Sequence, residues 1–204
     1  QWQTPMVGDT VRGKTLGIYG YGRVGKVVAG YGKAFGMRVI VWGRETTIDK
    51  AKADGYEIAA SKQALFEESD IVSLHVPLTP ETTHLIDRKA LRRMKRSAYL
   101  INTARGPVVD EEALAWALKE RLIAGAALDV TEPEPINLDS PLLKLPNCIV
   151  VPHIASASIA TRAKMATIAA SNVIAGFFRF QSAEFFSVPA AEQAVPRVDL
   201  KLTR

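Results

Sequence analysis

Short apolar runs alternate with segments of helical periodicity along most of the chain. The apolar runs contain few charged residues and cover 14–20, 37–43, 70–76, 98–103, 124–130 and 148–154. Apolar positions recur at the spacing of an amphipathic helix in 23–35, 62–68, 87–94, 110–120 and 158–178. Strands that are apolar throughout, separated by helices, are typical of a parallel sheet covered on both faces. The pattern therefore predicts an α/β fold of the Rossmann type, with a doubly wound parallel sheet.

The pattern changes near residue 157. Residues 1–157 contain all the predicted strands, and we expect them to form one domain. Residues 158–204 consist of a long, alanine-rich helix and a less regular tail with Pro189 and Pro196, which we interpret as an extension. The length of 204 residues is sufficient for a domain with a sizeable core.

Composition and charge narrow the class of protein. With 48% hydrophobic and 23% charged residues, the chain is typical of a folded globular protein. The net charge of +5 does not indicate nucleic-acid binding, because the dense basic cluster at 88–96 alternates with apolar residues as a solvated helix face does. A single cysteine, Cys148, excludes an intrachain disulfide. No signal peptide or membrane-spanning run is visible, so we expect a cytoplasmic protein without nucleic-acid, membrane or metal partners.

The turn GYGRVG (20–25) follows the first predicted strand. Ligands of doubly wound sheets bind at the carboxyl ends of the strands. Gly20 permits a tight turn, Gly22 lets a pyrophosphate approach the backbone, and Gly25 lets the next helix pack closely. The glycines alone are weak evidence, but their place between a strand and a helix favours a dinucleotide site over a structural turn. Residues 1–157 are therefore predicted to form a dinucleotide-binding domain.

The second strand ends in Gly43 and Arg44, where NAD-specific folds usually place an acid that binds the ribose 2′-hydroxyl. The absence of a carboxylate removes repulsion, and an arginine can pair with a 2′-phosphate. We therefore favour NADP over NAD as the cofactor. The alternative is that Arg44 stacks on the adenine or points to solvent, and the adjacent Glu45 makes this alternative credible.

The third strand end is SLHVPLTPETTHL (73–85). We expect this loop to line the adenosine side of the cofactor through His75, Val76, Pro77 and Thr82. For His75, a plain loop with a hydrogen-bonded histidine is an equally good interpretation.

The next three strand ends each carry a chemically distinctive residue. Arg105 follows 98–103, Asp129 ends GAALD with Glu134 five residues later, and His153 follows the last strand. Separately, these residues have ordinary explanations: a structural ion pair, a loop acid and a core histidine. Together at one sheet edge beside a dinucleotide, an arginine, a carboxylate and a histidine favour a catalytic set.

These motifs resemble those of the D-isomer-specific 2-hydroxyacid dehydrogenases. The matching stretches are GKTLGIYGYGRVG, SLHVPLTPETTHLI, LINTARGPVVDEEAL, AALDVTEPEP and VVPHIAS, in the order of the family, from about Lys14 to Ser156. The resemblance implies an NAD(P)-dependent enzyme in which Arg105 binds the substrate carboxylate and carbonyl, His153 is the acid/base and Glu134 pairs with His153. A guanidinium can hold a carboxylate with two hydrogen bonds, and a nearby carboxylate favours a charged imidazolium.

The resemblance also implies a cofactor site. Arg23 and Val24 would offer backbone groups to the pyrophosphate. Thr103, Ala104 and Asp129 would border the nicotinamide, with Asp129 near its carboxamide. Ala155 and Ser156 are further expected cofactor-binding residues. The Gly43–Arg44 pair resembles the NADP-using hydroxypyruvate and glyoxylate reductases, so glyoxylate or hydroxypyruvate is the expected substrate, followed by 3-phosphoglycerate and other D-2-hydroxy acids.

Family members carry a substrate-binding domain that this chain largely lacks, so we interpret the chain as truncated. The helix of 158–178 would return to that domain, and a homodimer is implied. The alternative function is a non-catalytic, NAD(P)-sensing protein-binding module like the corepressors of this fold. The presence of Arg105, Glu134 and His153 favours the enzyme.

Overall fold

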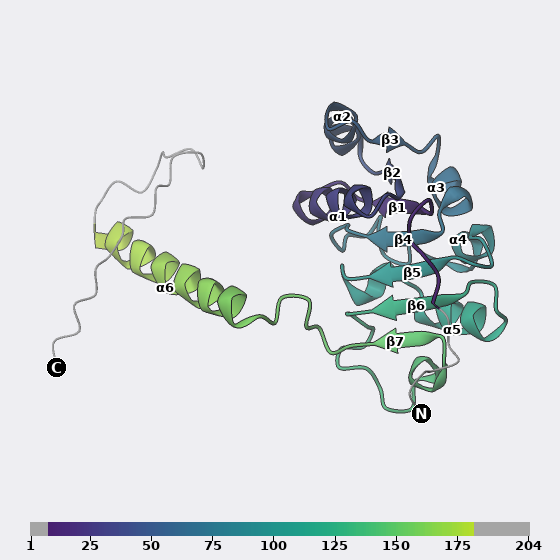
Figure 1. The fold of residues 1–204 in the computed structure, drawn as a ribbon. Coiled ribbons are helices and arrows are strands. Elements are labelled where there is room, and N and C mark those ends of the chain that lie inside the picture. Colours follow the sequence, from purple (N-terminus) through teal and green to yellow (C-terminus); the bar gives the residue numbers. More distant parts are fainter. Residues whose placement is uncertain (1–7, 182–204) are drawn as a thin grey trace, which may run out of the picture. The chain divides into compact units, whose positions relative to one another are not determined.

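The computed structural model describes residues 8–181. Seven parallel strands form one sheet in the order β3-β2-β1-β4-β5-β6-β7, and Figure 1 shows their arrowheads on the same side of the sheet. The strands are β1 (Thr15–Tyr19), β2 (Arg38–Trp42), β3 (Glu57–Ile58), β4 (Ile71–Leu74), β5 (Tyr99–Asn102), β6 (Gly125–Leu128) and β7 (Cys148–Val150). The order reverses between β1 and β4, which confirms the doubly wound sheet.

All predicted helices are present in this part of the chain. They are α1 (Arg23–Ala34), α3 (Lys62–Glu68), α4 (Arg88–Arg93), α5 (Glu111–Lys119) and α6 (Ile159–Gln181). Helix α2 (Glu45–Ala53) and the edge strand β3 were not predicted from the sequence. In α2 only Ala51 is buried, and β3 has two residues, so neither leaves a clear periodic pattern. Short 3₁₀ helices at Gly106–Val108 and Pro141–Lys144 were also missed.

The core lies on both faces of the sheet, as the alternation along β2 shows. Val39 and Val41 pack with Ala29 of α1 and Ala51 of α2, whereas Ile40 belongs to the cluster that contains the buried residues of α3, α4 and α5. Successive strand residues point to opposite faces. Therefore α1 and α2 cover one face and α3, α4 and α5 cover the other.

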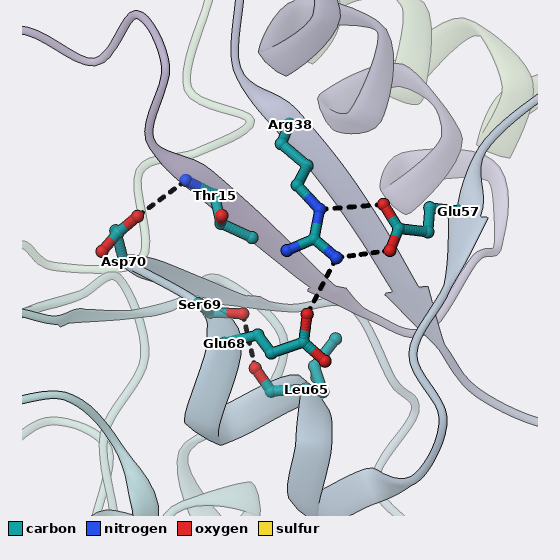
Figure 2. A network of polar contacts seen from close by, with 7 residues as sticks. All are labelled: Thr15, Arg38, Glu57, Leu65, Glu68, Ser69 and Asp70. Atoms are coloured by element: carbon teal, nitrogen blue, oxygen red, sulfur yellow. Dashed lines mark hydrogen bonds and ion pairs between the residues drawn. The ribbon is translucent and has the colours of Figure 1, made fainter.

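The amino ends of the strands are joined by ion pairs and hydrogen bonds (Figure 2). Arg38, the first residue of β2, donates from Nε to Glu57 of β3 at 2.8 Å and from Nη2 to Glu68 at 2.8 Å. The hydrogen bond from Arg38 lowers the pKa of the Glu57 carboxyl. The Thr15 amide donates to the Asp70 carboxylate at 2.8 Å and so links β1 to the start of β4. The charged groups at this edge are thus partnered within the protein.

The described chain divides after Ala155 into the sheet unit and a second unit that contains α6. None of the described helices has the length and apolar character that crossing a membrane requires. The predicted tail with Pro189 and Pro196 lies outside the described residues.

Candidate functional site at the carboxyl ends of the strands

The glycine turn brings backbone segments closer together than residues with side chains would allow. Gly20 has φ +99°, and a side chain there would meet the carbonyl oxygen of His75 at 2.6 Å. A side chain at Gly25 would overlap the carbonyl oxygen of Gly20, so glycine lets α1 pack on the turn. Gly22 has no atom within 4 Å of where a side chain would begin, and its position as N-cap of α1 leaves the first amides of the helix without a side-chain partner. Such a helix terminus suits an anionic group.

A pocket of about 440 Å³ lies beside this turn. Its lining joins the glycine loop and the start of α1 to α2, through Tyr21, Gly22, Arg23, Lys26, Thr47, Lys50, Ala53 and Asp54. Its one acid, Asp54, accepts hydrogen bonds from Tyr21 at 2.8 Å and Lys26 at 3.1 Å. The hydrogen bond from Lys26 lowers the pKa of Asp54 most. Arg23 and Lys50 have no carboxylate partner among residues 8–181, so the pocket carries unneutralised positive charge.

The end of β2 faces the glycine turn. A side chain at Gly43 would begin 3.7 Å from Cα of Gly20 and 3.8 Å from the amide nitrogen of Tyr21. An acid at position 43 would therefore reach the turn, and glycine removes that carboxylate. Arg44 is exposed at the N-cap of α2, without a carboxylate partner in the described part of the chain, and its carbonyl accepts a hydrogen bond from Thr47 at 2.7 Å.

The loop after β4 packs against the glycine turn at Gly20. The ring of His75 shares a hydrogen bond of 2.9 Å with the Ser73 hydroxyl, and burial lowers the pKa of His75 to about 4, so the ring is neutral. The half-buried Val76 also contacts the Gly20 region. Pro77 is exposed, and Thr82 donates to its carbonyl at 2.7 Å. The hydrogen bond of His75 thus joins the loop to the last residues of β4, and that of Thr82 lies within the loop.

Arg105 differs from Arg38 at the opposite edge. Its guanidinium is exposed, donates to the Ala104 carbonyl at 2.6 Å and has no carboxylate partner among the described residues. The turn that carries it is held by Asn102, which is fully buried, donates to the Arg105 carbonyl at 2.9 Å and accepts from the Ala104 amide at 3.0 Å. Thr103, between them, is exposed. The backbone of Arg105 is therefore fixed by a buried amide, and its guanidinium is exposed without an ion pair in the described part of the chain.

Asn102 was missed in the sequence. Its signal is a polar amide that ends an apolar strand, because a buried amide needs hydrogen-bond partners nearby.

His153 and Glu134 form the closest polar pair of the site. Nδ1 of His153 lies 2.6 Å from Oε1 of Glu134, and both side chains are about half exposed. An ionised carboxylate only accepts hydrogen bonds, so Nδ1 carries the proton and Nε2 is the nitrogen that can exchange a proton with a ligand.

The turn at His153 is held by Asp129. His153 has φ +51°, an unfavourable backbone conformation for a residue with a side chain. Its amide donates to the Asp129 carbonyl at 2.9 Å, and the Asp129 carboxylate accepts from the amides of Ile154 at 2.7 Å and Ala155 at 3.1 Å. Asp129 is buried, so its hydrogen bonds fix the strained turn. Ser156 belongs to the second unit.

The strand order brings Arg105, Glu134 and His153 to one edge, since they follow the neighbouring strands β5, β6 and β7. Residues 1–155 match the family model of the D-isomer specific 2-hydroxyacid dehydrogenase, NAD binding domain. The chain belongs to this dehydrogenase family.

The chain is also similar to individual proteins of known sequence or structure. The glyoxylate reductase of Korarchaeum cryptofilum is 55% identical over 170 residues, which are 83% of this chain and 51% of that protein. The solved TT0316 protein of Thermus thermophilus is 46% identical with a TM-score of 0.79, over 85% of this chain and 54% of that one. The D-lactate dehydrogenase of Aquifex aeolicus, solved with NAD and lactic acid, is 33% identical with a TM-score of 0.72, over 89% and 60%. This chain thus spans about half the length of the curated relatives it matches.

Proposed function

We propose that this chain is the cofactor-binding part of an oxidoreductase that transfers a hydride between NAD(P)H and a small 2-keto or D-2-hydroxy acid. The observation that carries the proposal is the 2.6 Å His153–Glu134 pair. Glu134 follows β6 and His153 follows β7, and β6 is the neighbour of β5, whose end carries Arg105 without a carboxylate partner among residues 8–181. An acid/base and a carboxylate anchor on one edge are what carbonyl reduction of a keto acid requires.

Arg105 is the proposed substrate anchor. A guanidinium holds a carboxylate with two parallel hydrogen bonds, which fixes the orientation of the neighbouring carbonyl. The absence of an ion pair for Arg105 in residues 8–181 supports this role, since no such internal carboxylate has to be displaced.

His153 is the proposed acid/base. In the reducing direction, Nε2 of His153 donates a proton to the oxygen of the growing alkoxide, and the Glu134 carboxylate stabilises the imidazolium and fixes the ring. The cofactor, when bound, supplies the hydride.

NADP is the proposed cofactor. The open backbone at Gly22 and the start of α1 suit the pyrophosphate through the amides of Arg23 and Val24, with Gly20 and Gly25 shaping the turn. Beyond β2, glycine at position 43 removes the usual acid, and Arg44 has no carboxylate partner among the described residues; both features favour a 2′-phosphate.

The remaining proposed cofactor contacts are Thr103, Ala104 and Asp129 at the nicotinamide, and His75, Val76, Pro77 and Thr82 on the adenosine side. Ala155 and Ser156 are further proposed cofactor-binding residues, to which no part of the cofactor is assigned.

Glyoxylate or hydroxypyruvate is the proposed substrate. The relative from Korarchaeum cryptofilum is named a glyoxylate reductase, and the structure from Aquifex aeolicus holds lactic acid, a small 2-hydroxy acid of the class that reduction of a 2-keto acid produces. A homodimer is the proposed assembly, which rests on the family resemblance alone.

Turnover can be tested by joining this chain to the half of the Korarchaeum cryptofilum relative that it does not match. We expect consumption of NADPH with glyoxylate, followed by the absorbance of the reduced cofactor. A folded chimera that binds NADPH and glyoxylate without turnover would contradict the enzyme and favour a sensor.

A further inference from the structure

The loop that carries Glu134 is held from a distant helix. The amide of Glu132, two residues before Glu134, donates to Oε1 of Glu111 at 2.6 Å. Glu111 is the first residue of α5 and lies 21 residues earlier in the chain. We propose that Glu111 is a positioning residue, which holds the Glu134 carboxylate at its hydrogen-bonding distance from His153. This inference rests on the proposed function, because it assigns a role within the same pair.

Glu111 behaves differently from its neighbour Glu112. Both acids lie in the first turn of α5, where a carboxylate is favoured by the helix dipole without leaving water. Glu112 is exposed and makes no hydrogen bond to a described residue, whereas the Glu111 side chain is partly buried against the loop. Burial raises the pKa of Glu111, and the hydrogen bond from the Glu132 amide opposes this effect only in part. The helix dipole does not explain this unfavourable burial, but the hydrogen bond to the Glu132 amide does.

The backbone immediately before Glu132 is tightly packed against the segment that follows Arg105. A side chain at Gly106, next to Arg105, would overlap the carbonyl of Thr131, so the two loops are in direct backbone contact. The Thr131 hydroxyl donates to the Pro133 carbonyl at 2.9 Å. Glu111 thus completes an anchor at residues 131–133 that also adjoins the Arg105 turn.

The two members of the pair have separate anchors. Asp129 fixes the turn of His153 through three backbone amides, and Glu111 fixes the loop of Glu134 through one. The Glu134 carboxylate itself is half exposed, and His153 is its hydrogen-bond partner among the described residues. A shift of about 1 Å in the loop is enough to break a hydrogen bond of this length. The pair therefore depends on Glu111 even though Glu111 does not touch it.

The tautomer of His153 measures this dependence. The chain contains three histidines, His75, His84 and His153, so nitrogen NMR of the imidazoles resolves each ring. We expect the neutral ring of His153 in the unaltered chain to be held in the Nδ1–H form, because the Glu134 carboxylate accepts from it. We expect Glu111→Ala to release the ring into a mixture of both tautomers.

Two matched variants distinguish the hydrogen bond of Glu111 from its negative charge and from a general effect on the fold. Glu111→Gln keeps a side-chain oxygen for the Glu132 amide and is expected to keep the Nδ1–H form. Glu112→Ala removes the neighbouring acid and is expected to change nothing. If Glu111→Ala unfolds the chain, which the His75 signal reports, Glu111→Asp gives the same test, because its shorter side chain does not reach the amide.

The results that overturn the role of Glu111 are an unchanged Nδ1–H form in folded Glu111→Ala or Glu111→Asp, or its loss in Glu111→Gln. Glu134→Ala distinguishes this failure from that of the proposed function. If Glu134→Ala releases the tautomer but the Glu111 variants do not, only the positioning role fails. If Glu134→Ala also leaves the tautomer fixed, the pair on which the proposed function depends is wrong.

Discussion

Nδ1 of His153 lies 2.6 Å from the carboxylate of Glu134, although 19 residues separate them. If the pair moves a proton as proposed, His153→Gln is expected to lower kcat/KM for glyoxylate by about 10²- to 10⁴-fold. Glu134→Gln is expected to lower it less, because the histidine is kept but is not stabilised when charged. Steady-state reduction by the chimera described above measures both. Full activity of folded His153→Gln would exclude this histidine as the acid/base.

Arg105→Lys tests the substrate anchor. A lysine keeps the charge but loses the two parallel hydrogen bonds, which are worth about 1.5–3 kcal/mol for a charged partner. We expect kcat/KM for a 2-keto acid to fall by about 10- to 100-fold, with the Kd of NADPH unchanged as the internal control. If cofactor affinity changes while turnover does not, Arg105 binds the cofactor and not the substrate, and the proposed anchor is wrong.

Gly22 and Gly25 form a matched pair for the glycine turn. Gly22→Ala adds a methyl group with no protein atom within 4 Å, so the thermal midpoint should be kept while cofactor binding is lost. Gly25→Ala overlaps the Gly20 carbonyl, so it should destabilise the fold itself. Thermal unfolding and calorimetry with NADPH separate the two effects. Undiminished NADPH binding by Gly22→Ala would place the pyrophosphate elsewhere.

Arg44 is predicted to decide between the cofactors. Arg44→Ala removes the proposed partner of the 2′-phosphate and is expected to weaken NADPH by about tenfold, or about 1.4 kcal/mol, with little change for NADH. Lys52→Ala is the control, because Lys52 is an exposed cation in the last turn of α2, at the other end of that helix from Arg44, and lies 4.0 Å from Asp49. Equal losses for both cofactors would support the alternative in which Arg44 stacks on the adenine.

Stability should fall in acid because of His75. Its pKa is lowered by burial to about 4 in the folded chain, whereas the unfolded value is about 6.5. The unfolded state therefore binds the proton first. Stability from this group is full above about pH 6.5 and falls by about 1.4 kcal/mol per pH unit as the pH drops towards 4. Urea unfolding of the unaltered chain and of His75→Gln measures it, and equal slopes for the two would contradict a buried neutral ring.

Much of the fold was predictable because its signals are local. Each apolar strand of the sheet, and the glycine turn, is recognisable from a few consecutive residues. The strand order follows from right-handed crossovers. The elements α2 and β3 were not predicted, since they bury little. The convergence of Arg105, Glu134 and His153 followed from their places at strand ends.

The contacts that support the site residues were harder to predict from the sequence. The hydrogen bond of Glu111 to the Glu132 amide and the hold of Asp129 on the His153 turn join residues more than 20 positions apart. They depend on how loops pack, which periodicity does not encode. For His75, the local hydrogen bond with Ser73 is the feature that the sequence left open.

Calorimetric titration of this chain with NADPH and, separately, NADH tests whether the carboxyl edge of the sheet is a dinucleotide site. We predict binding of NADPH at least tenfold tighter than NADH, a difference of about 1.4 kcal/mol. Equal or tighter binding of NADH would contradict only the role of Arg44 and would leave the dinucleotide site intact. Absence of binding for both cofactors, in a chain whose circular dichroism spectrum shows it folded, would contradict the dinucleotide site itself.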